Sequence, residues 1–390
     1  MNHKSFKYRF YPTPEQAELL EKTFGSCRFV WNQILDWRSK EYSLNGIKIN
    51  YTKTSAKMTQ LRQEFPWLQE ASYVALQQAL RNQDKAFSGF FAKHSNYPNF
   101  KKKFNKQSFR LVGTAFSIKN NNQVFIAKCK TPLNIKWTRS LESTPSSVTI
   151  SKDTANRYFI SFNCEIETKE LPKLNNSIGL DLGLTNFATT SNSEKIKPLK
   201  SYIKYQKLLA KLQRQHTKKQ KGSKNREYSR LKIAKVHNKI ADSRKDFLQK
   251  LSTKLIRENQ TICLEDLNVS GMVKNHKLAK GISDASWSEL VTMLKYKAEW
   301  YGRIISQISP WFPSSKLCSN CGFRLDKLPL NMRQWTCPEC NSLHDRDINA
   351  AKNINTAGLA EINACGVSSV GGVELMFDAR HDTLKQEIPA

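Results

Sequence analysis

Two short cysteine motifs place the strongest local constraint on how this chain can fold. Cys318 and Cys321 form one CxxC motif, Cys337 and Cys340 form a second, and fifteen residues separate them. Each CxxC turns two thiolates to one side, and two such turns complete a tetrahedron around Zn²⁺. Four cysteine ligands leave no open coordination position, so we expect a structural zinc site. A redox-active pair is the alternative, but two matched pairs without a thioredoxin-like context disfavour it.

The chain has nine cysteines, and the other five have no metal-binding spacing. We expect them to be small buried hydrophobic residues: Cys27, Cys129, Cys164, Cys263 and Cys365. The odd total and the paired motifs favour a reducing compartment. There is neither an apolar run of about 18 residues to span a membrane nor a recognisable secretory signal. We therefore expect a cytoplasmic protein without membrane association.

The chain is strongly basic, with 63 Lys and Arg, 33 Asp and Glu, and a net charge of +30. Residues 195–260 alone hold 21 basic and 4 acidic residues. A solvated helical face explains most charge runs, but this density on apolar-backed helices favours binding to a phosphate backbone. A 39% hydrophobic content excludes a disordered basic tail. Nucleic acid is the expected partner, with these candidate contacts: Lys218, Lys219, Lys221 and Arg226.

A second basic stretch covers residues 98–110 and interleaves cations with Phe100, Phe104 and Phe109. The aromatic rings could stack bases beside bound phosphates, or they could anchor the loop to the strands around it. Its candidate contacts are Lys101, Lys102, Lys103, Lys106 and Arg110. Three more polar residues at helical spacing could contact target DNA, although ordinary solvent exposure is the simpler interpretation: Gln77, Arg81 and Lys85.

Hydrophobic periodicity predicts a multidomain α+β protein. A strand at 6–11 precedes helical periodicity over 13–95, and short strands with turn signals follow over 108–166. After a polar linker, strands alternate with helices, including long helices at 199–220 and 226–258. Many short strands favour a small β-barrel or sandwich, with the helical segment as an insertion.

Three carboxylates stand inside or beside apolar segments. Asp181 lies within IGLDLGL, Glu265 ends the apolar run TICLE, and Asp347 begins a predicted helix just after the second CxxC. Taken singly, each acid is more simply a helix cap or an ion-pair partner, because a buried carboxylate needs a partner. Three in a basic chain instead indicate a cage for Mg²⁺, which prefers carboxylate and phosphate oxygens. Two such ions ~3.5–4 Å apart support phosphodiester hydrolysis.

At these residues the chain resembles TnpB, the accessory protein of bacterial insertion sequences that is related to compact type V CRISPR effectors. The resemblance covers about residues 6–366. Its landmarks, in this order, are YRFYPTPEQ, GSCRFVWN, KKKFNKQSF, IGLDLGLTNFAT, LEDLNVSGM, SWSELVTMLKYKAEWYG, SSKLCSNCG and HDRDINAAKNI.

The resemblance implies an RNA-guided DNA endonuclease with a RuvC-type, RNase-H-like core. The catalytic acids, which also hold Mg²⁺ or Mn²⁺, fall on Asp181, Glu265 and Asp347, with Asp345 ranked second to Asp347. The implied partners are a guide RNA from the protein's own element and double-stranded target DNA, with one protein monomer per RNA favoured. The rival interpretations are an RNase-H-like transposase and a non-cleaving guided regulator.

The expected domains follow from this resemblance together with the periodicity. They are a wedge-like β-barrel domain at 1–12 and 104–172, a helical recognition domain at 13–103, a RuvC-like nuclease domain at 173–312 and 344–362, a zinc ribbon at 313–343 and a weakly ordered tail at 363–390.

Overall fold

The computed structural model describes residues 2–119 and 122–364. The chain divides into two compact units, Met1–Thr168 with Tyr205–Ile240, and Lys169–Lys204 with Ala241–Ala390. Both units combine helices with sheets, as the predicted α+β class requires. Residues 365–390, which include Cys365 and nearly all of the predicted tail, lie outside the described residues.

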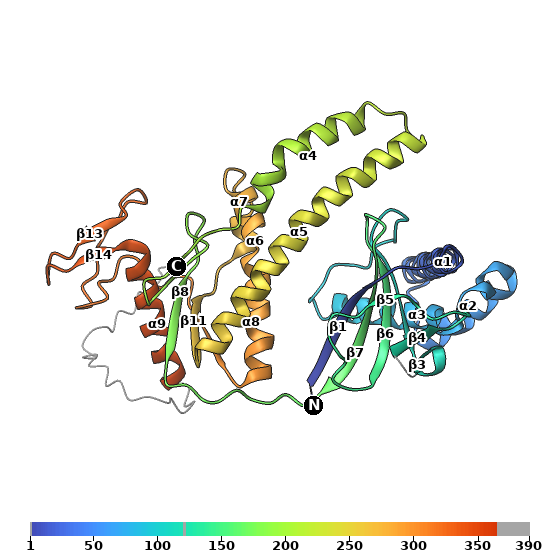
Figure 1. Cartoon of the computed structure of the whole chain (residues 1–390), viewed down its shortest axis with the longest axis horizontal. Coiled ribbons are helices and arrows are strands. Elements are labelled where there is room, and N and C mark those ends of the chain that lie inside the picture. The colour runs from blue at the N-terminus through green and yellow to red at the C-terminus, as the bar shows by residue number, and fades with distance from the viewer. Residues whose placement is uncertain (1, 120–121, 365–390) are drawn as a thin grey trace. The chain divides into compact units, whose positions relative to one another are not determined.

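A five-stranded antiparallel sheet organises the first unit (Figure 1). Its order is β2 (Gln107–Val112), β6 (Pro145–Lys152), β7 (Tyr158–Ile166), β1 (Asn2–Phe10) and β5 (Ile135–Lys136). The alternating pattern of the first strand places Phe6, Tyr8 and Phe10 in the core. A separate hairpin joins β3 (Phe116–Lys119), which the sequence pattern missed, to β4 (Gln123–Ile126).

Helices of the first unit complete its hydrophobic core. They are α1 (Pro14–Asn45), α2 (Tyr51–Glu64), α3 (Tyr73–Phe91) and the 3₁₀ turns Pro66–Glu70 and Gly113–Ala115. Thr13 and Gln16 form a capping box at the start of α1. The Gln16 amide also donates to the carbonyl oxygen of Pro132 at 3.1 Å, which fixes the helix to the loop before β5.

The basic region forms α4 (Ser201–Thr217) and α5 (Lys224–Glu258), close to the two predicted long helices. The turn between these helices includes Gly222, which has a φ of 84°, in the left-handed region. The second half of α5 carries a run of aliphatic side chains into the core of the second unit, including Leu248, Leu251 and Leu255.

A mixed five-stranded sheet organises the second unit. Its order is β10 (Lys195–Ile196), β9 (Ala188–Thr190), β8 (Ser177–Asp181), β11 (Thr261–Glu265) and β12 (Ile304–Ile308). The pairs β8–β11 and β11–β12 are parallel, whereas β8–β9 and β9–β10 are antiparallel. Helix α9 (Arg346–Ala364) covers one face, and α5 with α8 (Trp287–Tyr301) covers the other (Figure 1).

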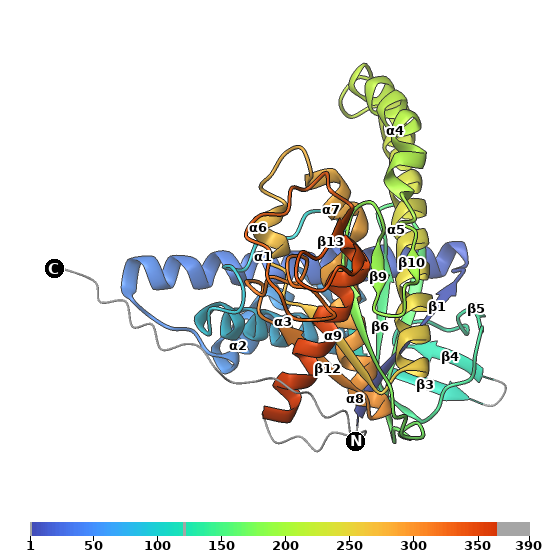
Figure 2. The same cartoon turned by 90° about the vertical axis from the view of Figure 1, so that its left-hand side faces the viewer.

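Short elements complete the second unit. The helices α6 (Val269–Met272) and α7 (Ala279–Ala285) follow β11. The hairpin of β13 (Gln334–Thr336) and β14 (Leu343–Asp345) leads directly into the N-terminal end of α9 (Figure 2). In the described part of the chain, no helix combines the length and apolar character needed to cross a membrane.

Candidate active site and metal centre

Two of the three predicted acids end neighbouring parallel strands. Asp181 is the last residue of β8 and Glu265 is the last residue of β11. Leu180 pairs with Leu264, so the two acids occupy the next position on each strand. Neighbouring strands lie about 4.8 Å apart. The sheet register therefore places both carboxylates side by side at its carboxyl edge.

Helix α9 brings the third acid to the same edge. A Cβ added to Gly179 would lie 2.0 Å from the carbonyl oxygen of Ala351, so the helix packs directly on the backbone of β8. Asp347 precedes Ala351 by one helical turn and therefore lies on the same helix face. Because side chains alternate along a strand, Asp181 shares the α9 side of the sheet with Gly179.

The second strand acid lies on this same side. A Cβ at Gly358 of α9 would lie 2.5 Å from the sulfur of Cys263, so Cys263 faces the helix. Glu265 is two residues further along β11 and shares that face. The three predicted acids are thus gathered on one face at one end of the sheet.

Burial raises the pKa values of the two strand acids, and repulsion from the neighbouring carboxylates adds to this effect for Asp181. Burial, followed by the charges of Glu265 and Asp347, raises the pKa of Asp181 to about 7. Burial also raises the pKa of Glu265, against the opposing effect of a 2.6 Å hydrogen bond donated by Ser314 Oγ. Arg333 lies 3.4 Å from an Asp347 oxygen. A divalent cation would favour the ionised carboxylates, so the donor set suits Mg²⁺.

Asp345, the second-ranked acid, has structural partners instead. One of its carboxylate oxygens accepts hydrogen bonds from the backbone N–H groups of Asp347 and Ile348, each at 3.1 Å. The other lies 2.6 Å from Lys195 Nζ. The pKa of Asp345 is lowered because these hydrogen bonds together outweigh its burial. Asp345 therefore caps the helix that carries Asp347.

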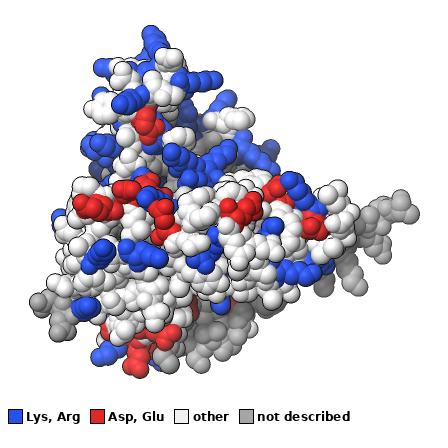
Figure 3. Space-filling view, turned by 90° about the vertical axis from the view of Figure 1, so that its right-hand side faces the viewer, with Lys and Arg blue, Asp and Glu red and all other residues white. Residues whose placement is uncertain are grey.

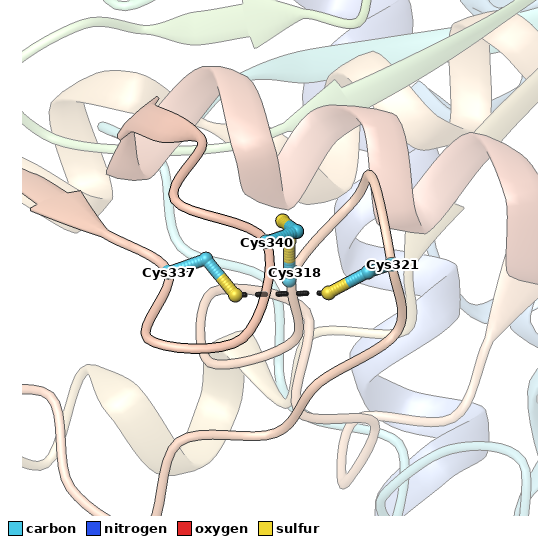
Figure 4. Close-up of side chains that lie close together, drawn as sticks. All are labelled: Cys318, Cys321, Cys337 and Cys340. Carbon is cyan, nitrogen blue, oxygen red and sulfur yellow. Dashed lines mark hydrogen bonds between the residues drawn. The ribbon is translucent and has the colours of Figure 1, made fainter.

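The four predicted zinc ligands converge (Figure 4). The sulfur atoms of Cys318, Cys321, Cys337 and Cys340 all lie within 4.8 Å of one another, and within residues 2–119 and 122–364 no other three or more His, Cys, Asp and Glu ligand atoms do so. The acids therefore form a more open cluster than the thiols. Hydrogen bonding to Ser342 lowers the pKa of Cys340, which favours the thiolate that binds metal. This donor set fits Zn²⁺.

Sequence reasoning missed the residues that support both sites. His344 is buried and places Nε2 3.0 Å from the sulfur of Cys318. Asn349 and Asn353, on α9, both donate to the carbonyl oxygen of Leu317. The helix that carries Asp347 thus also holds the first CxxC turn. All three residues lie within the motif HDRDINAAKNI, where sequence reasoning singled out only the two acids.

The four other cysteines that the structure describes follow the prediction with one exception. Cys27, Cys164 and Cys263 are buried, as expected. The expectation of burial is wrong for Cys129, which is only partly buried and lies 3.1 Å from the carbonyl oxygen of Thr131 in a loop.

The α4–α5 pair presents many of the predicted basic contacts. Lys and Arg side chains predominate over its surface (Figure 3). Lys218 and Lys221 are exposed, and Lys219 is partly buried. Arg226 instead donates to the carbonyl oxygens of His216 at 3.2 Å and Lys219 at 2.6 Å. That guanidinium closes the turn between the two helices.

The 98–110 stretch has one ring that anchors it to the core and two exposed rings. Phe109 is buried in the core, whereas Phe100 and Phe104 are exposed. Lys102, Lys103 and Lys106 are exposed, Lys101 packs 3.9 Å above the ring of Trp31, and Arg110 donates to Ser147 Oγ at 2.8 Å. A cavity of about 240 Å³ lies in this stretch and includes Arg28 in its lining.

The three polar residues on α3 differ in exposure. Arg81 and Lys85 are exposed, and Gln77 is partly buried. The guanidinium of Arg81 lies 5.3 Å from the centre of the Tyr51 ring.

The described features define a two-unit α+β protein with an acidic cluster and a four-cysteine cluster that could hold a metal ion. Three family profiles match it: OrfB_IS605, "Probable transposase", over 161–276, the Cas12f1-like TNB domain over 287–354, and the OrfB_IS605 helix-turn-helix domain over 1–46. The last range here forms β1 and the continuous helix α1 rather than two short helices.

Several known proteins are similar along nearly the whole chain. A Streptomyces pristinaespiralis protein named for RNA-guided DNA endonuclease activity is 47% identical, covering 93% of this chain and 91% of its own. InsQ of Escherichia coli K12, named for the same activity, is 29% identical, and the match covers 93% of this chain and 94% of InsQ. The TnpB-like protein L770 of Acanthamoeba polyphaga mimivirus is 24% identical, and the match covers 91% of this chain and 73% of L770. The chain belongs to the TnpB family.

A solved structure shares the fold at low identity. Cas12f1 in a complex with a single guide RNA and target DNA aligns with a TM-score of 0.57 and 13% identity, covering 88% of this chain and 83% of Cas12f1.

Proposed function

We propose that this protein is an RNA-guided DNA endonuclease that hydrolyses phosphodiester bonds with two divalent metal ions. The observation that carries the proposal is the convergence of Asp181, Glu265 and Asp347 at one edge of the second sheet. The activity for which the two bacterial relatives are named supports the reaction and its guidance.

We assign the second unit to the RuvC-type, RNase-H-like class of folds. Its sheet order β10-β9-β8-β11-β12, antiparallel at one end and parallel at the other, supports this assignment. Two of the acids, Asp181 and Glu265, lie at the carboxyl ends of parallel strands, where open α/β sheets bind their ligands. Strands β1, β2 and β5–β7 would form the core of the wedge-like domain, and α1–α3 would form the recognition domain.

Each acid would have a defined role. Asp181, Glu265 and Asp347 would hold the ions, which activate water and stabilise the leaving oxygen when bound. Ser314 would orient Glu265 through its 2.6 Å hydrogen bond. Arg333, beside Asp347, would face the phosphate from the outside of the cluster. The four cysteines would hold Zn²⁺ and fix the hairpin that precedes α9.

The basic surfaces would bind guide RNA and target DNA. Lys218, Lys219 and Lys221 of the α4–α5 pair, with the exposed lysines of 98–110, would follow the phosphate backbone. Arg81 and Lys85 would approach the target duplex from α3. Base pairing with the guide would select the sequence, while the protein reads backbone shape and a short adjacent motif. One protein molecule per RNA is the proposed stoichiometry.

Plasmid cleavage by protein purified with its RNA tests this function. With Mg²⁺ and a matching target, wild-type protein and the control Asp246→Ala, an exposed residue of α5 paired with Lys250, should cut equally. Asp181→Ala should not cut. Equal cutting by Asp181→Ala would reject the assigned site. Sequencing the copurified RNA should give one structured species, whereas a heterogeneous mixture would indicate electrostatic binding without guidance.

Strand transfer is a second candidate, because the family that matches residues 161–276 is described as a transposase. It predicts joined products when purified protein is incubated with the ends of an insertion sequence. Guided DNA binding without any Mg²⁺-dependent cutting would instead indicate a regulator.

A further inference from the structure

A cavity of about 180 Å³ adjoins the acidic cluster in the second unit. Its lining includes Glu265 and Leu182, the residue that directly follows Asp181. Leu182 and Gln307 alternate with residues that face α9, so this part of the cavity lies on the α8 side of the sheet. The cavity therefore meets the acidic cluster at Glu265, at one end of the sheet, while its Leu182 and Gln307 wall lies on the face opposite α9.

Apolar side chains supply five of the ten residues that line the cavity, and polar or charged side chains supply the other five. Leu182 and Leu267 approach from the strand ends, while Trp287 and Val291 approach from α8. Trp287 is 2% exposed, and its indole Nε1 has no hydrogen-bond partner among the residues that the structure describes. A buried donor without a partner is unfavourable. Among the described residues that line the cavity, Trp287 alone has a buried side-chain polar atom without a partner.

The polar groups of the lining disfavour an anion. The ammonium of Lys295 is accompanied by the carboxylates of Glu265 and Asp266, and the Gln307 amide donates to Asp266 at 3.2 Å. A phosphate would meet more negative than positive charge here. A neutral ring with hydrogen-bonding edges suits this mixed lining better, because its faces can contact the apolar side chains while its edge atoms meet polar groups.

The size of the cavity admits such a ring. An engineered apolar cavity of about 150 Å³ binds benzene, and this cavity is larger. A pyrimidine base has a ring of the same size with polar substituents at its edge. Its faces would contact Leu182 and Val291, and its edge atoms would meet the Gln307 amide.

We propose that this cavity binds one unpaired nucleobase of the DNA strand being cut, next to the scissile phosphate. The inference rests on the proposed nuclease function and deepens it. A base can enter the cavity only after leaving the duplex stack, as in enzymes that act on flipped bases. Because Glu265 and Leu182 join the cavity to the acidic cluster, an inserted base would fix the neighbouring phosphate at the acids.

Photo-crosslinking tests binding independently of cleavage. Single-stranded oligodeoxynucleotides containing 5-iodouracil would be irradiated with the purified full chain, and the attachment sites would be mapped by mass spectrometry. We expect attachment at Trp287 or its neighbours on α8, and a smaller yield with cytosine competitor. Attachment confined to the basic α4–α5 pair would overturn the proposal.

Filling the cavity provides the matched variants. Val291→Phe places a ring in the cavity, whereas Val273→Phe adds the same ring at an exposed position outside it. Val291→Phe should bind the oligonucleotide about tenfold more weakly, which is in the range for the removal of one stacked base, and Val273→Phe should bind normally. If Val291→Phe lowers the melting temperature, Ser288→Trp, at an exposed position in the cavity lining, is used to obstruct the cavity instead and should weaken oligonucleotide binding in the same way.

Abasic substitution links the cavity to the cut. An abasic nucleotide would be placed in turn at each position flanking the cleavage site of a guided target. At one of these positions the abasic nucleotide should slow cleavage by the wild-type protein about as much as Val291→Phe slows cleavage of intact DNA. The Val291→Phe variant should then cut the abasic target no more slowly than it cuts intact DNA. Additive losses at every position would overturn the proposal. Absence of wild-type cleavage would reject the nuclease function, while crosslinking would still decide the cavity.

Discussion

Gly179 lies directly beneath Ala351, with no room between them for a side chain. A Cβ at position 179 would lie 2.0 Å from the Ala351 carbonyl oxygen and 2.7 Å from the backbone nitrogen of Asn355. Both obstacles are backbone atoms of α9, so the helix itself would have to move. The closeness of this packing sets the height of Asp347 above Asp181.

Gly179→Ala should therefore impair cleavage without touching a carboxylate. Overpacking of this kind typically costs about 1–3 kcal/mol, and displacement of α9 should lower the cleavage rate by at least tenfold. Gly25→Ala is the control, because a Cβ there meets only Arg28 at 3.8 Å within α1. That substitution should leave stability equal or raise it by up to about 1 kcal/mol. Chemical denaturation and plasmid cleavage measure both effects.

Asp347 and Asp345 should respond differently to replacement. Asp347→Ala should abolish cleavage and leave the melting temperature nearly unchanged, since its side-chain contact with Arg333 is long at 3.4 Å. Asp345→Ala should lose a helix cap worth about 0.5–2 kcal/mol and retain most of its cleavage. The reverse pattern would make Asp345 the metal ligand. Thermal melting and cleavage of the same protein batches separate the two.

The parts of the site that sequence could predict are those with a local signature. Asp181 and Glu265 can be recognised because a charged residue at the end of an apolar run such as IGL or TICL requires a partner or a metal ion. The four cysteines can be recognised by their CxxC spacing. Ser314 lies 49 positions from Glu265, and nothing in either segment encodes their hydrogen bond. The cavity beside Glu265 draws on segments from Leu182 to Gln307. Only the folded sheet brings them together.

The same limit applies to short strands. Strand β10 has two residues and β3 has four, so neither offers enough alternation to detect. Each is fixed by its partner strand instead.

Lys297 should make stability depend on alkaline pH. It is 5% exposed and donates to Gln249, Ser252 and Thr253 of α5, and burial lowers its pKa from 10.5 to about 8. Between these values the unfolded chain binds more protons than the folded one. The free energy of unfolding should therefore rise with pH from about 8 to 10.5, by at most about 1.4 kcal/mol per pH unit.

Denaturant titration at several pH values measures this slope. Lys297→Met should reduce it, whereas Lys250→Met, an exposed residue on α5, should preserve it. An unchanged slope in Lys297→Met would assign the dependence to another group.

The four-cysteine centre should hold one Zn²⁺ per chain and stabilise the hairpin before α9. Cys337→Ser should lose the metal and lower the melting temperature, because three thiolates cannot close the tetrahedron. Cys129→Ser should retain both properties, since Cys129 lies in a loop apart from these ligands. Metal analysis of the purified proteins checks the first effect and calorimetry the second. Retention of a full equivalent of zinc by Cys337→Ser would contradict the assignment.

The α4–α5 pair should dominate the salt dependence of nucleic-acid binding. Replacing Lys218, Lys219 and Lys221 with alanine should flatten the slope of log affinity against log salt by up to about 0.9 for each phosphate that the protein no longer neutralises. The matched triple replacement of Lys40, Lys48 and Lys53 removes three exposed lysines from the α1–α2 region and should change the slope less. Arg226→Ala should act differently, because that side chain holds the carbonyl oxygens of His216 and Lys219. It should lower helix stability with little change in slope, and a flattening equal to that of the lysine triple would show that Arg226 itself binds phosphate.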